Sequence, residues 1–531
     1  MTQAELRAGP ADTDAGACAS PFLEFVRREF TLAVWARWVK RRRGGTVPQG
    51  LDHLSQAKWV AGFPGFREEM LKDLEAGTFR FRFFRRITLA GGEKARRLCI
   101  PSVHDRLLML LLTRYLRQAW GMRAGARVRP CSREIQKAIA RERQGFFLKT
   151  DIQAFFDSVD HGLLLEKIDS KGDPILGAVV RSLLGTPALT MEEVWQARID
   201  HGGQVWRGEV ERRSRAERTA RGLPQGLPCS TPLAEIFLLD FDREAAALPG
   251  LRMFRFVDDL LFLGGGPAEL ERARGFLARA GQRLRLVFAP GKTREGKVAD
   301  GFDFLGFLHR PGYCARSERA VALFKRKWIR ALVDPVAFLR RRVPRELAFP
   351  VQVLGCQGTR PAREILFRLV VQTYNVSILG WSREWLPGTS LFRMVLAGLP
   401  PEKRPPEGLT RADFAEVAAE LHAMGRGAGG GIMGTATHNA FCTDGAQIAA
   451  LNHWAGKLFA SYARQLGLPP PPLVDHLKWF FRYRRNRPGV RAKALACLLE
   501  VLADRWAVRD RLRSLAEHWG LQESGGGDCP S

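Results

Sequence analysis

The pattern of hydrophobic and polar positions divides the chain into three regions. An apolar, basic stretch from Phe22 to Arg43 predicts helix and ends near the breakers Pro48 to Gly50. From about residue 71 to 320, short β-branched or aromatic runs alternate with amphipathic stretches, which predicts one α/β unit. Beyond about Ala320 the pattern is mainly that of helices.

Proline and glycine clusters subdivide the helical region. They lie at Pro400 to Pro406, at Gly425 to Gly434 and at Pro469 to Pro472. The glycine stretch lacks the Lys-Ser/Thr of a phosphate-binding loop, so we expect a flexible connection there. The predicted segments are 1–70 (helical), 71–320 (α/β), 321–400 (helical), 401–523 (helical and basic) and 524–531 (unstructured).

The charge balance points to a polyanionic partner. Lys and Arg number 83 against 55 Asp and Glu, a net charge of +28, in a chain whose 46% hydrophobic content is that of a globular protein. Nucleic acid is the first candidate and an anionic membrane surface the second. A third interpretation is an Arg-rich, solvated surface without a specific partner.

The apolar runs and the cysteines indicate where in the cell the protein is expected. The longest apolar runs, such as Leu107 to Leu112, are too short to cross a bilayer, and we expect no membrane partner. The N-terminus lacks the basic flank and apolar core of a signal peptide. Nine scattered cysteines without a C-x-x-C pair predict reduced thiols, no structural zinc and a cytoplasmic location.

A first candidate acid closes an apolar run. Phe146 to Thr150 predicts a strand that delivers Asp151 at its end. We expect Ser158 to cap the amphipathic helix that contains Leu163 to Ile168. An acid at a strand end is a common metal ligand and an equally common ordinary cap.

A second candidate site is the acid pair Asp258 and Asp259. Apolar runs on both sides predict a hairpin with the pair near its turn, and these flanks are expected to bury the tip. Adjacent buried carboxylates repel each other and need a cation or a proton; the alternative is an exposed Asp-Asp turn. With Asp151 they form the acid set that a two-metal phosphoryl-transfer site requires.

Between these acids lies the loop Gly222-Leu-Pro-Gln-Gly226, in which Gly and Pro predict a tight turn that a flat ligand can approach. Ser230 or Thr231 is expected to cap the following helix, with Pro232 in its first turn.

Five motifs in order resemble those of reverse transcriptases. They are Asp-x-x-x-Phe-Phe, Gly-Leu-Pro-Gln-Gly, Phe-Val-Asp-Asp, Gly-Lys-Thr and Phe-Leu-Gly-Phe. The sequence is most similar to bacterial members, namely group II intron, retron and defence-associated enzymes. The resemblance covers about Phe79 to Phe307 and implies an α/β (α+β) right-hand polymerase, with fingers and palm followed by a mostly helical thumb and extension.

The resemblance also implies roles for matching residues. The metal site, for two Mg²⁺ ions with Mn²⁺ as a substitute, would comprise Asp151, Ile152, Asp258 and Asp259. The nucleotide site would comprise Lys94, Arg96, Phe156, Gln225 and Gly226. Phe156 would crowd the sugar 2′ carbon and favour deoxynucleotides, while Lys292 would protonate the leaving pyrophosphate. An ordinary solvated lysine is the alternative for Lys292, and an ordinary core hairpin is the alternative to a primer grip at Phe304 to Phe307.

Three positions depart from the family pattern. Phe256 replaces the usual Tyr before the acid pair, Cys99 replaces a glycine and Arg97 replaces a proline. None of the three is a metal ligand.

The C-terminal region offers weaker signals. Lys478 to Arg487 interleaves aromatics with cations, which suits nucleic acid or equally an amphipathic helix with core aromatics. His438-Asn439 and Asn452-His453 lack nearby cysteine pairs, which argues against an intron-type nuclease. The lack of that nuclease signature, together with a long helical C-terminus, favours a phage-defence reverse transcriptase or another domesticated one.

We therefore expect an RNA-directed DNA polymerase that uses an RNA template, a DNA or RNA primer and dNTPs, with a non-coding RNA or protein as a further partner. The alternatives are template-independent or protein-primed synthesis by the same site, and a dormant polymerase-fold RNA-binding factor.

Overall fold

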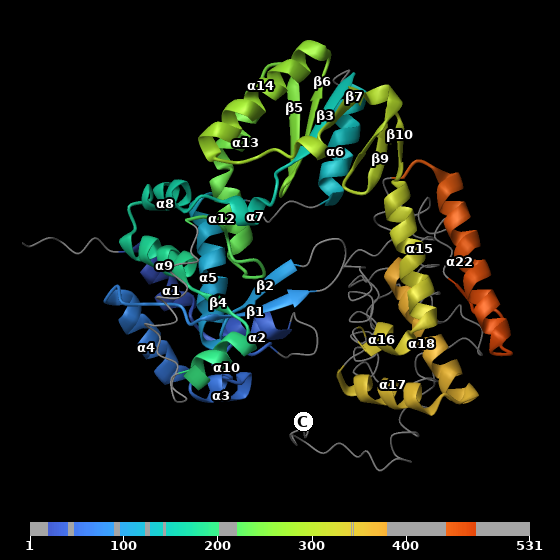
Figure 1. Cartoon of the computed structure of the whole chain (residues 1–531), viewed down its shortest axis with the longest axis horizontal. Helices are drawn as coiled ribbons and strands as arrows, with labels where there is room; N and C mark the ends of the chain where they lie inside the picture. The colour runs from blue at the N-terminus through green and yellow to red at the C-terminus, as the bar shows by residue number, and fades with distance from the viewer. Residues whose placement is uncertain are drawn as a thin grey trace, which may run out of the picture. The chain divides into compact units, whose positions relative to one another are not determined.

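The structure is a computed structural model that describes residues 20–40, 47–89, 96–122, 128–141, 145–200, 220–340, 342, 345–379 and 442–473 (Figure 1). These residues belong to two units, each assembled from separate stretches of the chain. The first comprises Met1–Ala126, Leu148–Phe262 and Ala268–Arg294. The second comprises Arg127–Phe147, Leu263–Pro267 and Glu295–Ser531.

The N-terminal part of the first unit is helical, with α1 (Pro21–Glu29), α2 (Leu32–Lys40), α3 (Gln56–Ala61) and α4 (Phe63–Glu75). The helix predicted from Phe22 to Arg43 is thus two helices, and residues 41–46 lie outside the described residues. Ser20, the N-cap of α1, donates to Asp173 at 2.7 Å, and Asp173 itself caps α9 (Pro174–Gly185). One buried carboxylate therefore fixes the starts of two helices.

A small sheet of order β2-β1-β4 follows. Strands β1 (Phe84–Leu89) and β2 (Arg96–Ile100) pair antiparallel, and β4 (Ala188–Leu189) lies parallel to β1. The apolar run from Leu107 to Leu112 lies in α5 (Val103–Ala119), where it is almost entirely buried. In the part of the chain that the structure describes, no helix is both long and apolar enough to span a membrane.

The central sheet has the order β5-β6-β3-β7. Its strands are β3 (Phe146–Asp151), β5 (Leu251–Phe256), β6 (Asp259–Gly264) and β7 (Arg294–Lys297). The inner strand β6 is buried from Leu260 to Leu263, because helices α13 (Leu239–Ala246) and α14 (Pro267–Leu284) cover it (Figure 1). The ring of Phe276 in α14 lies 6.2 Å from Phe262 and 5.0 Å from Phe241 of α13.

Two predicted helix caps are wrong. Helix α8 (His161–Asp169) is capped by Asp160, which accepts the Leu163 N–H at 3.2 Å. The chain first forms the short helix α7 (Phe155–Ser158), so Ser158 instead donates to main-chain carbonyls of that turn. In α12 (Ser230–Phe237) neither Ser230 nor Thr231 caps, because the N-cap is Cys229 and the Ser230 hydroxyl donates to the Pro224 carbonyl. The first unit also contains α10 (Met191–Asp200).

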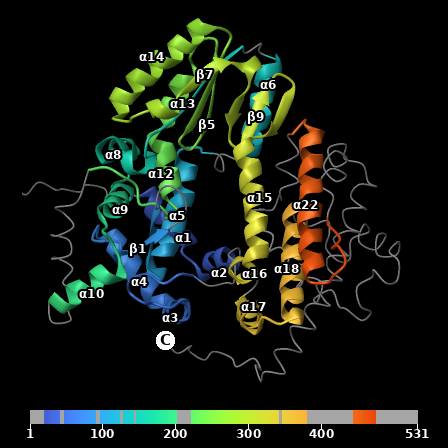
Figure 2. The ribbon, with the colours of Figure 1, turned by 45° about the vertical axis from the view of Figure 1, so that its right-hand side comes forward.

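The second unit combines a three-stranded antiparallel sheet with helices. Strands β8 (Phe302–Phe304), β9 (Phe307–Arg310) and β10 (Tyr313–Arg316) accompany α6 (Val128–Arg141), α15 (Glu318–Val333), α16 (Pro335–Arg340), α17 (Arg345–Gln357), α18 (Arg360–Leu379) and α22 (Gly445–Gln465). Tyr374 of α18 lies 4.8 Å from Trp328 of α15 and 5.0 Å from Phe459 of α22. These buried rings join the three helices, which run side by side in Figure 2.

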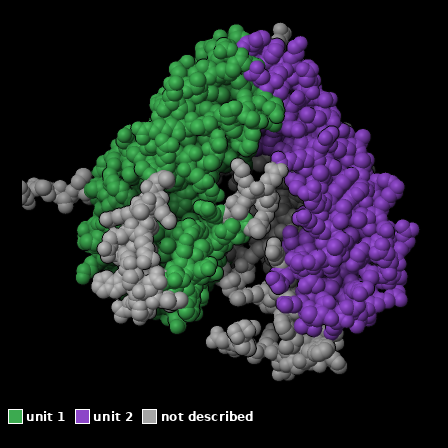
Figure 3. Space-filling view, in the orientation of Figure 1, with its two compact units in different colours: residues 1–126, 148–262, 268–294 green, residues 127–147, 263–267, 295–531 purple. Residues whose placement is uncertain are grey.

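The prediction of an α/β region followed by mainly helical structure is confirmed for the described residues. Each unit is coloured separately in Figure 3. The segment boundaries at 70, 320, 400 and 523 stay predictions.

Candidate active site

Main-chain pairing positions Asp151 at the end of β3. The Asp151 carbonyl accepts the Ala289 N–H at 2.9 Å, and the Ile152 N–H donates to the Asp258 carbonyl at 3.0 Å. Ile152 also bridges to Phe288 and is buried. The backbone therefore brings the strand that ends in Asp151 beside the hairpin that bears the acid pair.

The hairpin tip is strained. Strand β5 ends at Phe256 and β6 begins at Asp259, so Val257 and Asp258 form the turn. Val257 has φ +62°, a left-handed conformation that costs a non-glycine residue about 1–2 kcal/mol and is rarer still for a β-branched one. Such strain persists only where the surroundings hold it, and it gathers at functional sites.

Arg255 supplies that hold. Its Nη1 donates to the Val257 carbonyl at 3.1 Å, and its Nε donates to Asp242 of α13 at 2.7 Å. The guanidinium is largely buried, and a second nitrogen also bonds the Asp242 carboxylate. A two-pronged contact of this kind fixes the guanidinium plane, so Arg255 is a rigid support for the turn before Asp258.

The predicted hairpin is confirmed, but the expectation that its flanks bury the tip is wrong. Asp258 is half-buried and Asp259 is exposed, although the next four residues of β6 are all buried. The acids at the turn are therefore open to solvent and to a substrate.

The acids still influence one another. Burial by the surrounding protein, followed by the charges of Asp258 and Asp151, raises the pKa of Asp259 to about 6. Lys149 and Lys292 act in the opposite direction. The Asp259 side chain is exposed to solvent, yet the protein beside it desolvates part of the carboxyl. The three carboxylates share one electrostatic site.

Lys292 is the counter-ion of Asp151. It ends the short 3₁₀ helix Pro290–Lys292, and its Nζ lies 2.5 Å from Asp151 Oδ2. The hydrogen bond to Asp151 raises the pKa of Lys292 above its usual value. Its side chain remains 71% exposed, against 12% for Asp151. The loop therefore delivers a cation to the acids that stays accessible from solvent.

The donor set fits a divalent cation. Oδ1 of Asp151 is buried and accepts no hydrogen bond within the described residues. Leaving such an oxygen without a partner is unfavourable, and hard cations such as Mg²⁺ take carboxylate oxygens as ligands. Across the described ranges, however, no three acid, His or Cys side chains are already grouped to hold a metal. The fit lies in the chemistry of Asp151, Asp258 and Asp259 and not in a preformed cage.

The two phenylalanines after Asp151 diverge. Phe155 is 3% exposed and belongs to the core, whereas Phe156 is half-buried, with the two ring centroids 5.7 Å apart. The Phe156 carbonyl accepts the Leu223 N–H at 2.6 Å. Phe156 therefore lies against the loop from Gly222 to Gly226.

That loop also touches β2. The Gln225 carbonyl accepts the Cys99 N–H at 2.7 Å, and the Gln225 amide donates to Asp157 at 3.4 Å. Gly226 has φ +96°, and a Cβ there would lie 3.1 Å from the Cys99 carbonyl. Glycine is thus required by both conformation and space. The structure brings Phe156, Gln225 and Gly226 together with β2, which begins at Arg96, another residue of the predicted nucleotide site.

Several predicted residues lie outside the described residues, namely Lys94, Gly425 to Gly434, His438-Asn439 and Lys478 to Arg487. The main chain of Arg96 pairs with Leu89 in the β1–β2 hairpin.

In the second unit, Leu305 and Gly306 have φ +51° and +81°, so Phe304 to Phe307 turns as a tight hairpin.

The sequence reading missed Arg255 and Asp242. The only sequence signal for Arg255 was a cation between Phe254 and Phe256 inside an apolar strand. Its partner on α13 could not be inferred from periodicity.

Residues 91–309 match the family described as "Reverse transcriptase (RNA-dependent DNA polymerase)". A comparison with curated proteins gives no match. Similar solved structures include a C-terminally truncated apo telomerase from Candida tropicalis (TM-score 0.30, 13% identity, 48% of this chain and 60% of that chain). Others are Candida albicans telomerase in complex with a TWJ fragment of telomeric RNA (0.32, 12%, 78% and 70%) and apo Candida tropicalis telomerase (0.34, 10%, 84% and 80%). The chain thus spans 60% of the first of these telomerases.

TM-scores of this size establish no common arrangement of whole chains, so the family assignment rests on the matched segment. That segment contains Asp151, Gln225, both acids of the hairpin and Lys292. The expected fold class, a right-hand polymerase with mixed sheets and helices, is confirmed. Residues 91–309 are therefore a reverse transcriptase domain, the domain of an RNA-directed DNA polymerase.

Proposed function

We propose that the protein adds deoxynucleotides to the 3′ end of a DNA or RNA primer on an RNA template, by a two-Mg²⁺ mechanism. The observation that carries the proposal is the shared electrostatic site of Asp151, Asp258 and Asp259, inside the segment that matches the family. The charges of Asp258 and Asp151 help to raise the pKa of Asp259, and neighbouring carboxylates of this kind are unfavourable in a folded protein unless a cation joins them. A protein that only bound RNA would have no physical reason to keep them together.

The chain's own residues define the chemistry. Asp151, Asp258 and Asp259 are the proposed ligands, with Ile152 beside them. They would hold two Mg²⁺ ions, or Mn²⁺ in their place, which would supply activation of the primer hydroxyl and neutralisation of charge on the leaving phosphate. Lys292 holds its proton firmly next to Asp151 and is the proposed donor to the leaving pyrophosphate.

The nucleotide would lie against the loop from Gly222 to Gly226. The half-buried ring of Phe156 is proposed to exclude a ribose 2′-hydroxyl, and Gln225 and Gly226 to line the pocket. Lys94 and Arg96 would bind the triphosphate through charge-assisted hydrogen bonds. This arrangement would make the polymerase selective for deoxynucleotides.

The net charge of +28 supports an extended contact with template and primer, since cations displace the counter-ions of nucleic acid. We also propose a cytoplasmic location, in keeping with six free cysteines in the described residues. A non-coding RNA or protein is proposed as a further partner.

Primer extension on a defined RNA template tests the proposal. We expect Mg²⁺-dependent products whose sequence follows the template. Products formed without a template would indicate template-independent synthesis, and product covalently attached to the protein would indicate protein priming. RNA binding without any dNTP incorporation would identify a dormant RNA-binding factor and overturn the proposal.

Phage defence is the proposed biological setting, supported by the resemblance to defence-associated enzymes. Cells that express the chain should show fewer plaques than cells that express Asp258→Ala. Equal plaque numbers across a broad phage panel would contradict this role and leave the enzymatic proposal untouched.

A further inference from the structure

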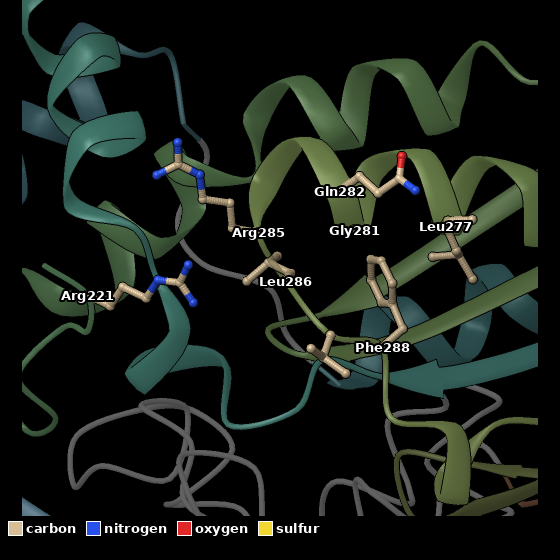
Figure 4. Close-up of a pocket in the computed structure, with 9 residues that line it drawn as sticks. Arg221, Leu277, Gly281, Gln282, Arg285, Leu286 and Phe288 are labelled. Atoms are coloured by element: carbon tan, nitrogen blue, oxygen red, sulfur yellow. The ribbon is translucent and has the colours of Figure 1, made fainter. Parts of the chain in front are cut away.

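A groove of about 570 Å³ opens in the first unit, next to the strand that ends in Asp151 (Figure 4). Its wall is formed by the last turns of α14 and by the segment from Leu286 to Phe288. Figure 4 shows the Arg221 and Arg285 side chains at one end and those of Leu277 and Phe288 at the other. The groove is therefore cationic at one end and apolar at the other.

The apolar end exposes surface that a soluble domain normally covers. Val287 is 55% exposed, and Phe288 is half-buried with its ring 6.1 Å from that of Phe241. A Cβ on Gly281 would lie 3.1 Å from the Leu286 carbonyl and 3.5 Å from the Phe288 ring. The glycine lets this segment lie close against α14. Flat apolar and aromatic surface of this kind suits the face of a nucleobase.

Two arginines contact one carboxylate at the cationic end. Asp160, whose side chain is 7% exposed, lies 2.8 Å from Arg285 and 3.8 Å from Arg221. Both guanidiniums reach into solvent, with the Arg285 side chain 58% exposed and that of Arg221 49% exposed. An anionic group in the groove could meet both guanidiniums from the solvent side.

The backbone of Arg285 has a left-handed conformation that is unfavourable for a residue with a side chain. It has φ +55° just beyond the end of α14, where the Leu286 N–H bonds back to the Gly281 carbonyl at 2.9 Å. Helices that end in this way usually place glycine there, because other residues lose about 1 kcal/mol in the left-handed region. The strained position holds the guanidinium at the end of the groove.

We propose that the groove binds one nucleotide of a single-stranded nucleic acid, with the phosphate at Arg221 and Arg285 and the base against Val287 and Phe288. The identity of the polyanion rests on the proposed function; the cavity and its charge do not. The occupant would touch the backbone that positions the acids, since the Gln153 N–H donates to the Val287 carbonyl at 2.8 Å. The site would thus hold a strand outside the nucleotide pocket.

Val287 offers a test in which only the sign of charge changes. Val287→Glu and Val287→Lys both remove the apolar side chain and place opposite charges in the groove. A single-stranded RNA oligomer with 4-thiouridine is crosslinked to the full chain, without dNTP or Mg²⁺, and the attached peptide is mapped. We expect crosslinks within residues 277–288, lowered about tenfold by Glu relative to Lys. Thermal melts of both variants establish that each is folded.

The absence of crosslinks within residues 277–288, or equal losses in Glu and Lys, would overturn the proposal. Competition by uridine monophosphate as effective as that of the oligomer would also overturn it, because the site would then take a free nucleotide. Primer extension is measured separately. Extension without these crosslinks refutes the groove alone, whereas crosslinks without extension refute the proposed polymerase function alone.

Discussion

Substitutions of Lys292 distinguish a role as proton donor in catalysis from a role as counter-ion of Asp151. Lys292→Met removes the ammonium that lies 2.5 Å from Asp151, and Lys292→Arg keeps the charge but carries a group that does not release its proton. If Lys292 protonates the leaving pyrophosphate, both variants lose activity. If it serves only as counter-ion, Lys292→Arg retains activity.

The structure sets the expected magnitudes. The Lys292 side chain is 71% exposed, and an ion pair open to solvent contributes only about 0–1 kcal/mol to the free energy of unfolding. Lys292→Met should therefore lower the melting temperature by at most a few degrees. Loss of a positioned acid lowers kcat by roughly 10²–10⁴-fold. A large fall in kcat with little change in stability is the expected signature.

The assay is single-nucleotide primer extension with saturating dNTP, alongside thermal melts, for wild type and both variants. Lys297→Met, the same substitution at an exposed lysine of β7, is the matched control and should leave kcat unchanged. A kcat for Lys292→Met within threefold of wild type would refute any catalytic role. Full activity of Lys292→Arg would refute proton donation and leave only the charge.

Three further predictions follow from the site and the charge. Because the folded pKa of Asp259 is raised to about 6 from 3.8, the folded state binds more protons between these values. In urea melts, the wild-type free energy of unfolding should therefore fall by about 1 kcal/mol as pH rises through about 4 to 6, after allowance for solvent screening. Asp259→Asn should lack this loss of stability, and in extension assays it should lack dNTP incorporation. Phe156→Ala should raise the kcat/KM ratio for rNTP over dNTP. Phe155 is 3% exposed, so Phe155→Ala should lower the free energy of unfolding by about 3–5 kcal/mol and leave that ratio unchanged. An unchanged ratio in folded Phe156→Ala would place the sugar gate elsewhere. RNA affinity should fall steeply with salt, and a flat dependence between low and physiological ionic strength would favour another partner for the basic surface.

Local patterns were enough to predict the elements of the site. Asp151 closes an apolar run, the acid pair interrupts another, and glycine and proline mark the loop at Gln225. Each of these signals depends only on residues a few positions apart in the sequence, and the hydrophobic pattern contains that information. The hairpin and the α/β region followed from the same patterns.

Tertiary contacts decided what the patterns could not. Asp160 instead of Ser158 caps α8, because the chain first turns through α7. Asp259 is exposed although the next four residues of β6 are buried, and the flanking apolar runs do not encode this difference. The pair of Arg285 and Asp160 joins side chains 125 residues apart. Sequence spacing alone gives no access to such a pair.

The measurement that tests the account most directly is dNTP incorporation on an RNA template–primer by purified wild type and Asp258→Asn. The variant keeps the size of the side chain and removes one charge from the acid site, so it should fold. We predict template-directed, Mg²⁺-dependent extension by the wild type and at least a thousandfold loss, about 4 kcal/mol of transition-state stabilisation, in the variant. Equal extension by both proteins would contradict the assignment of these acids as the catalytic centre.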